Sequence, residues 1–144
     1  MFTPVDRIFT RLGASDKILE GKSTFFMEME ETKNILVQGS KRSLAIVDEL
    51  GRGTSTFDGY SIANAVLSYL VRTIKCRSLF ATHYHMLLDD FCSEEDVSSY
   101  FMDCKADPEK PDLIKMLYKF TKGDCPNSFG MNVALMSGIS QTIV

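Results

Sequence analysis

The sequence predicts an α/β fold with a mostly parallel sheet and crossover helices. Two predicted strands, residues 44–48 and 78–81, contain short apolar runs that lead into polar, titratable residues. Runs of this length are typical of strands that are buried on both faces of a parallel sheet. One stretch with helical spacing precedes the first run and another separates the two runs, which gives the β-α-β-α order of such a sheet.

The first segment of the chain predicts a strand, a loop and a helix. Residues 7–11 alternate in polarity and indicate a short strand, and residues 13–21 are expected to form a loop with one helical turn. Ser23 or Thr24 can cap a helix that runs to about Val37, and Gly39 ends it as a C-cap. Four residues share one face at helical spacing, Phe25, Met29, Thr32 and Leu36, and the other face is expected to carry Glu28, Glu31 and Lys33.

The later elements follow the same logic. A second helix is expected from about Asp58 to Thr73, and a short helical piece over residues 84–89. Residues 98–104 and 113–120 predict two strands, and the proline-containing segment 106–111 between them makes a late antiparallel hairpin plausible. Ser128 could cap a final helix that ends near Gly138. The second helix turns five residues inward: Ile62, Ala63, Val66, Leu67 and Leu70.

Composition restricts the class of protein. The 144 residues suit one domain, and 44% hydrophobic and 24% charged residues are ordinary for a globular protein. The net charge of −3 argues against a basic nucleic-acid surface. The four cysteines form no Cys-x-x-Cys pair, so we expect reduced thiols rather than disulfides or a metal site. No signal-peptide pattern or long apolar run is present, which predicts an intracellular protein that is neither secreted nor membrane-bound.

Asp48 and Glu49 are the most informative candidates for chemistry. They follow a predicted strand at its carboxyl end, where open α/β sheets bind ligands. In nucleotide hydrolases an aspartate there helps to hold Mg²⁺, and a nearby group orients the attacking water. The alternative is a solvated acidic turn. Thr82 and His83 follow the next predicted strand, so both strand ends could converge on one site.

Three motifs resemble the C-terminal ATPase domain of MutS proteins, the mismatch-recognition ATPases of DNA repair. They are residues 23–28 (STFFME), 48–59 (DELGRGTSTFDG) and 81–85 (ATHYH), and residues 6–16 fit as well. The doubled Phe25-Phe26 and the tail segments 117–120 and 123–126 are most similar to the eukaryotic subfamily that supplies the mismatch-binding subunit of a heterodimer. The resemblance covers nearly the whole chain.

This resemblance implies an ABC-type P-loop NTPase core, with residues 1–144 as a partial MutS-type ATPase domain. No Gly-x-x-x-x-Gly-Lys-Ser/Thr sequence, the Walker A motif, occurs in the 144 residues. Gly21-Lys22-Ser23-Thr24 resembles its end but has no first glycine at the right offset. We therefore expect the chain to lack the phosphate-loop part, which the family places upstream of the first strand.

The resemblance also assigns roles to individual residues. Asp48 matches the residue that positions Mg²⁺ through water, Glu49 the residue that orients the hydrolytic water, and His83 the sensor of the γ-phosphate. His85 matches no known role. Ser23 and Thr24 match the signature that contacts the nucleotide of the other subunit, although Ser23 could also be a plain helix cap. The turn that faces the partner subunit comprises Gly51, Arg52, Gly53, Thr54 and Ser55.

The implied function is ATP hydrolysis that drives a DNA clamp, with ATP and Mg²⁺ as cofactors. The implied partners are a second MutS-family subunit in a heterodimer and mismatched duplex DNA, which binds through domains outside this chain. The implied location in a eukaryote is the nucleus. One alternative is a non-catalytic module that completes a partner's site through Ser23. An ABC-type chromosome-maintenance ATPase is disfavoured, because such proteins carry Leu-Ser-Gly-Gly-Gln where this chain has Ser23-Thr24-Phe25-Phe26.

Overall fold

The computed structural model describes residues 3–13, 23–106, 113–125 and 128–143. It divides into two compact units, Met1–Asp89 and Asp90–Val144, which are described separately. The predicted loop at 13–21 lies almost entirely outside the described residues, as does most of the predicted connection at 106–111.

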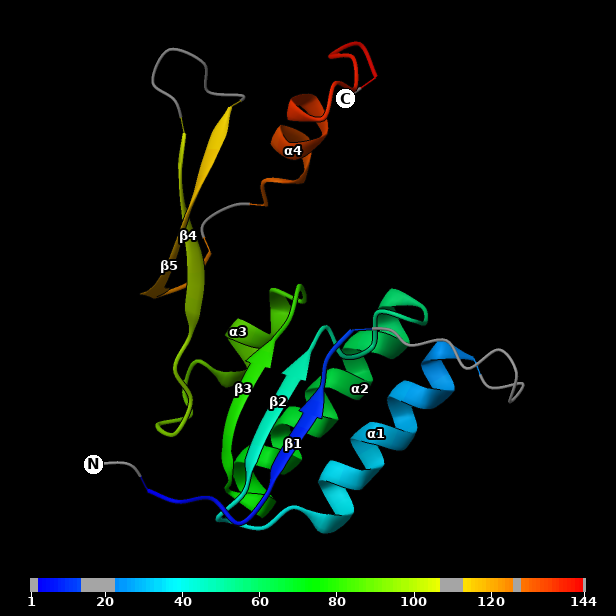
Figure 1. Cartoon of the computed structure of the whole chain (residues 1–144), viewed down its shortest axis with the longest axis vertical. Coiled ribbons are helices and arrows are strands. Elements are labelled where there is room, and N and C mark those ends of the chain that lie inside the picture. The colour runs from blue at the N-terminus through cyan, green and yellow to red at the C-terminus, as the bar shows by residue number, and fades with distance from the viewer. Residues whose placement is uncertain (1–2, 14–22, 107–112, 126–127, 144) are drawn as a thin grey trace. The chain divides into compact units, whose positions relative to one another are not determined.

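The first unit is built on a parallel sheet of three strands (Figure 1). The strands are β1 (Ile8–Arg11), β2 (Leu44–Asp48) and β3 (Arg77–Ala81), in the order β1-β2-β3. In the register, Ile46 lies opposite Thr10 on one side and Leu79 on the other. The predicted parallel sheet is therefore confirmed.

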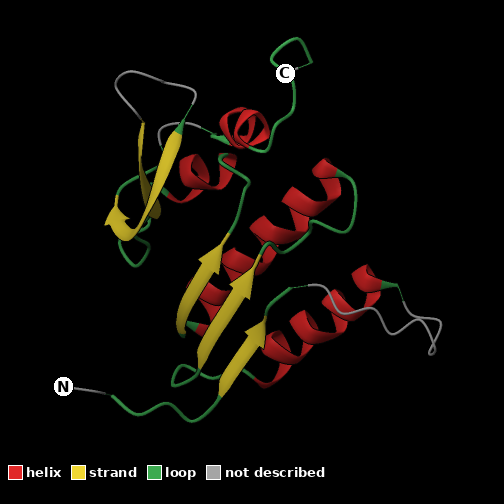
Figure 2. Cartoon of the chain, turned by 45° about the horizontal axis from the view of Figure 1, so that its top comes forward, coloured by secondary structure: helices red, strands yellow, loops and turns green. Residues whose placement is uncertain are grey.

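Two helices connect these strands. Helix α1 (Thr24–Gln38) links β1 to β2, and α2 (Thr56–Tyr69) continues as the π-helical segment η2 (Leu70–Ile74) before β3. Both helices lie on the same face of the sheet (Figures 1 and 2). The two strand–helix–strand connections join neighbouring strands in sequential order. When such connections have the same handedness, both helices must cover the same face of the sheet. The short helix α3 (Met86–Phe91) follows β3.

The core lies between this sheet and the two helices. Ala45 and Val47 of β2 are completely buried and pack with Ile35, Val66 and Leu70 from the helical layer. The opposite face of β2 is only half-buried, so the expectation of burial on both faces is wrong for this unit. The reason is that both crossover helices cover the same face.

The structure corrects the predicted role of Gly39. Its φ of −65° is not the left-handed conformation of a glycine C-cap. Instead, a β-carbon at this position would lie 2.5 Å from the carbonyl oxygen of Ile35. Glycine is required because the chain passes close to the last turn of α1. Helix α2 begins at Thr56, two residues earlier than predicted, because Ser55 caps it by accepting a hydrogen bond from the Asp58 amide.

The second unit contains the predicted antiparallel hairpin, formed by β4 (Tyr100–Ala106) and β5 (Ile114–Lys122). The register shifts between Met102 and Cys104. The rings of Tyr100 and Phe120 stack with their centroids 4.5 Å apart. Helix α4 (Gly130–Met136) has Phe129 at its N-cap, so the predicted cap at Ser128 is wrong.

Cys76, Cys92, Cys104 and Cys125 are free thiols. No group of three or more histidine, cysteine, aspartate or glutamate side chains is placed to hold a metal ion within the described part of the chain. Among the described residues, no helix is both long and apolar enough to cross a membrane.

Candidate functional site

The ends of β2 and β3 form the candidate site, in the first unit. Asp48 is the last residue of β2 and lies opposite Ala81, the last residue of β3. The Glu49 amide donates a hydrogen bond to the carbonyl of Ala81, with an N···O distance of 3.0 Å. The acidic pair and the segment that carries His83 therefore leave the sheet from adjacent strands at the same edge.

Glu49 has an unusual backbone conformation. Its φ of 47° lies in the left-handed region, which residues with a side chain rarely adopt. This conformation turns the chain out of β2 at once, and the Arg52 amide donates to the Glu49 carbonyl at 3.3 Å. The Glu49 carboxylate pairs with Arg52, whose side chain is mostly exposed. Glu49 thus lies at the surface, in a turn whose shape depends on strained backbone.

His83 is exposed and lies beside Tyr84, with ring centroids 4.2 Å apart. The Tyr84 amide donates a hydrogen bond to the Thr82 hydroxyl at 3.0 Å, which shapes the segment after β3. Tyr84 itself is buried, and its ring also meets Tyr60 edge to face. A buried aromatic anchor therefore holds the backbone next to the exposed histidine.

The start of α1 is the second part of the candidate site. The Ser23 hydroxyl accepts a hydrogen bond from the Phe26 amide at 3.1 Å, which makes Ser23 the N-cap. Ser23 remains exposed and Thr24 is half-exposed. The structure thus assigns Ser23 the capping role that the sequence left open, and a contact with a partner's nucleotide stays a prediction.

The turn of residues 51–55 lies against the start of α1. A β-carbon at Gly53 would lie 3.3 Å from the Phe25 β-carbon and 3.4 Å from Oε2 of Glu28. The turn ends at Ser55, which exchanges hydrogen bonds with Asp58 at the start of α2. The predicted signature and the predicted partner-facing turn therefore lie side by side.

Gly51 is the fixed point of this turn. Its amide donates to the Glu28 carboxylate with an N···O distance of 2.6 Å. Its carbonyl accepts a hydrogen bond from the Tyr84 hydroxyl at 3.0 Å. Gly51 is buried, so both of its backbone polar groups are satisfied by side chains from other elements.

The burial of Glu28 corrects the sequence analysis. Glu28 was expected on the exposed face of its helix, but only 3% of the residue is accessible. Arg11 of β1, which is also buried, pairs with it at 3.5 Å. The buried side of α1 comprises Glu28, Thr32 and Ile35, at helical spacing. A charged residue can occupy that side because it binds Arg11 and the Gly51 amide.

Burial raises the pKa of the Tyr84 hydroxyl, and the nearby negative charge of Glu28 raises it further. The phenol therefore stays protonated at neutral pH. Only the protonated form can donate the hydrogen bond to Gly51.

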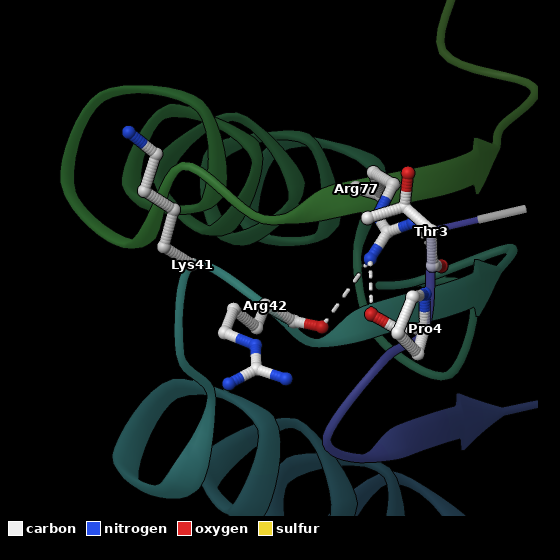
Figure 3. Close-up of a pocket in the computed structure, with 5 residues that line it drawn as sticks. All are labelled: Thr3, Pro4, Lys41, Arg42 and Arg77. Carbon is white, nitrogen blue, oxygen red and sulfur yellow. Dashed lines mark hydrogen bonds between the residues drawn. The ribbon is translucent and has the colours of Figure 1, made fainter. Parts of the chain in front are cut away.

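A separate hollow of about 390 Å³ lies where β2 and β3 begin, at the opposite ends of the strands from Asp48. Figure 3 shows its lining residues, Thr3, Pro4, Lys41, Arg42 and Arg77. The Arg77 guanidinium donates to the backbone carbonyls of Thr3, Pro4 and Arg42 at 3.0 to 3.5 Å. Arg77 thus uses its donors to hold neighbouring chain segments together. The hollow is not part of the candidate site.

The structure brings the predicted residues together as two neighbouring groups. One group is the strand ends with Asp48, Glu49 and His83, and the other is the turn 51–55 with the start of α1. Sequence reasoning missed the residues that hold them in place: Arg11, Glu28 and Tyr84. The spacing of Glu28, Thr32 and Ile35 was the signal that could have shown Glu28 to be buried.

Comparisons with known proteins identify the family of the chain. The family model described as MutS domain V matches residues 1–144, and the chain therefore belongs to this family. The chain is 51% identical over 146 residues to the DNA mismatch repair protein Msh6 of Homo sapiens. This match covers 99% of the chain and 11% of the relative.

Two further relatives extend the comparison. DNA mismatch repair protein MSH6 of Saccharomyces cerevisiae is 47% identical and covers 100% of the chain and 12% of its own length. DNA mismatch repair protein MutS of Ruminiclostridium cellulolyticum is 46% identical, over 97% of the chain and 16% of its own length. The chain thus spans a small part of these proteins. The predicted similarity to the Msh6 branch of MutS proteins is confirmed.

Proposed function

We propose that this chain supplies the half of a nucleotide-hydrolysis site that binds Mg²⁺ and orients water, in a MutS-type mismatch-repair protein. The observation that carries the proposal is the placement of Asp48 and Glu49. They leave β2 beside the end of β3, joined by the hydrogen bond from the Glu49 amide to Ala81. Ligands of parallel α/β sheets bind at this edge.

The donor set at this edge suits Mg²⁺ and a nucleotide. Mg²⁺ in such sites is held by one or two carboxylates, phosphate oxygens and water, rather than by a cage of protein ligands. Asp48, half-buried at the strand end, offers one such carboxylate. Bound Mg²⁺ would neutralise charge on the phosphates during hydrolysis.

The remaining roles are those that the resemblance to MutS proteins implies, and the positions of the residues are compatible with them. Glu49 orients and polarises the water, because its carboxylate follows Asp48 directly at the exposed edge. His83, exposed on the segment after β3, interacts with the γ-phosphate. Ser23 and Thr24 at the start of α1 present free backbone amides to the nucleotide of a partner subunit, and the turn 51–55 faces that subunit.

We further propose that the three-stranded sheet belongs to an ABC-type P-loop NTPase core. In this proposal ATP binding and hydrolysis switch a DNA clamp in a heterodimer with a second MutS-family subunit, in the nucleus of a eukaryotic cell. Mismatched duplex DNA binds through other domains, since the chain carries a net charge of −3.

The test uses the intact protein that contains this chain, assembled with its partner subunit. Glu49→Gln should lower hydrolysis by roughly 10²-fold or more, a typical general-base contribution, while ATP stays bound. Asp48→Asn should instead weaken Mg²⁺-dependent nucleotide binding. Single-turnover hydrolysis and nucleotide-binding titrations with and without Mg²⁺ separate the two effects.

The same measurements address the alternative of a non-catalytic module. In that case Glu49→Gln would leave hydrolysis at the wild-type rate, and a change at Ser23 would reduce hydrolysis at the partner's site only. Hydrolysis by Glu49→Gln at the wild-type rate therefore contradicts the proposed function.

A further inference from the structure

Gly51 links the two parts of the candidate site. Its amide is held by Glu28 from α1, and its carbonyl is held by Tyr84 from the segment after β3. The residue between Glu49 and Gly51, Leu50, is completely buried. The turn that begins at Glu49 is therefore anchored two residues later by side chains from two other elements.

The Glu28 contact is a strong one for a buried amide. A hydrogen bond to a carboxylate is stronger than one between neutral groups, and an unsatisfied buried amide would be costly. Arg11 compensates the charge of Glu28 from β1. The contact thus joins β1, α1 and the turn after β2.

The geometry also fixes where the start of α1 lies relative to this turn. Gly53 has no side chain, which leaves room for Phe25 in the first turn of α1. The start of α1 therefore lies against the turn at both Phe25 and Glu28. Glu49, which has the left-handed backbone conformation, lies at the other end of the same turn.

We propose that Glu28 and Tyr84 are positioning residues for hydrolysis, which hold Gly51 and thereby orient Glu49 and couple it to the α1 signature. This inference rests on the proposed function, because it requires Glu49 to orient the water. A contact between Ser23 and the nucleotide of the partner subunit would in this way influence the Glu49 carboxylate, which serves the nucleotide of its own subunit. Neither residue contacts the nucleotide itself in this proposal.

The test uses two conservative variants in the intact heterodimer, each with a matched control. Tyr84→Phe removes only the hydroxyl that binds the Gly51 carbonyl. Its control, Tyr69→Phe, removes a hydroxyl at the last residue of α2, where 44% of the residue is exposed. Glu28→Gln removes the charge that the Gly51 amide binds. Its control, Glu31→Gln, removes the charge of the second α1 carboxylate that pairs with Arg11.

We expect both variants to lower kcat by about tenfold or more, because small misplacements of reacting groups cost up to about 10²-fold. The KM for ATP and nucleotide affinity should stay within about twofold of wild type. Rates are expressed per bound nucleotide, so an unfolded fraction does not contribute. In a Glu49→Gln background the same variants should cause no further loss, since they act through Glu49.

Each other outcome overturns the inference. A kcat equal to that of the controls means that the anchor does not position Glu49. A loss that adds fully to that of Glu49→Gln, or a parallel loss of nucleotide binding, assigns Glu28 and Tyr84 a structural role only. The proposed function fails separately, if Glu49→Gln itself hydrolyses ATP at the wild-type rate.

Discussion

The backbones of Gly51 and Gly59 are in direct contact. A β-carbon at Gly51 would lie 2.5 Å from the carbonyl oxygen of Gly59, and the φ of Gly51 is +90°. A β-carbon at Gly59 would lie 2.3 Å from the Gly51 carbonyl oxygen and 2.2 Å from the Tyr84 hydroxyl. The turn after β2 and the first turn of α2 can approach this closely only because both residues are glycine.

Gly59→Ala should therefore destabilise the first unit. Neither neighbour of the added methyl can move freely, since one is backbone and the other is a hydroxyl that binds Gly51. Overpacking of this kind costs about 1 to 3 kcal/mol. Hydrogen exchange of the β2 amides in the intact protein measures the loss as a lower free energy of opening.

Gly130→Ala is the matched control. A β-carbon at Gly130 would have its nearest neighbour, the Ser128 hydroxyl, at 3.8 Å, and alanine is favoured in helices. Exchange of the α4 amides should be unchanged or slower. Equal protection of the β2 amides in Gly59→Ala and wild type would contradict the tight contact.

Asp6 makes the stability of the first unit depend on pH in the acidic range. Hydrogen bonds from the Ser40 and Ser43 hydroxyls hold the pKa of Asp6 below its usual value of 3.8. Because the pKa of Asp6 is lower in the folded state than in the unfolded state, these hydrogen bonds stabilise the fold fully above pH 3.8. This stabilisation is lost as the pH falls through the folded pKa. Asp6→Asn removes the ionisable group and with it this pH dependence.

Hydrogen exchange of the β1 and β2 amides provides the measurement. The protection of wild type over Asp6→Asn should be fully present above pH 3.8 and should decrease progressively as the pH is lowered below that value. Asp96→Asn, a change at an exposed aspartate of the second unit, should not alter this comparison. A difference between wild type and Asp6→Asn that stays constant across this range would show that the hydroxyl contacts do not depend on the charge.

Most of the first unit could be predicted from hydrophobic periodicity. The strand at 44–48 and the inward residues of α2 and η2 follow from spacing alone, because Ala63, Val66 and Leu70 are buried as expected. The helix ends were less predictable. The close approach at Gly39 and the cap at Ser55 depend on where neighbouring segments lie, which spacing does not encode.

The candidate site could be predicted at its chemical residues but not at its supports. Asp48, Glu49 and His83 stand out because titratable residues follow apolar strands. Glu28 was placed on the wrong face because a charge normally indicates exposure. Its spacing with Thr32 and Ile35 indicated the buried side of α1. Its partners Arg11 and Gly51 lie 17 and 23 residues away in the sequence, and periodicity contains no information on such pairings.

Ser23 caps α1 and lies exposed beside its first turn. The free amides and the positive end of the helix dipole there suit a phosphate. We expect Ser23→Tyr, in one subunit of the heterodimer, to reduce hydrolysis at the partner subunit's site and to leave nucleotide affinity at its own site nearly unchanged. Site-resolved nucleotide crosslinking assigns the loss to one site or the other.

Two further variants separate contact from capping. Ser23→Ala removes the cap, which costs about 0.5 to 2 kcal/mol, but adds no bulk, whereas Ser23→Asn retains a capping side chain. If Ser23 acts across the interface, Ser23→Tyr should impair the partner's site far more than Ser23→Ala. A loss of equal size in Ser23→Tyr and Ser23→Ala, confined to the mutated subunit's own site, would show that Ser23 serves only its own helix. Such a result would remove the trans role from the proposed function and leave the roles of Asp48 and Glu49 unaffected, because these residues lie at the ends of the sheet strands.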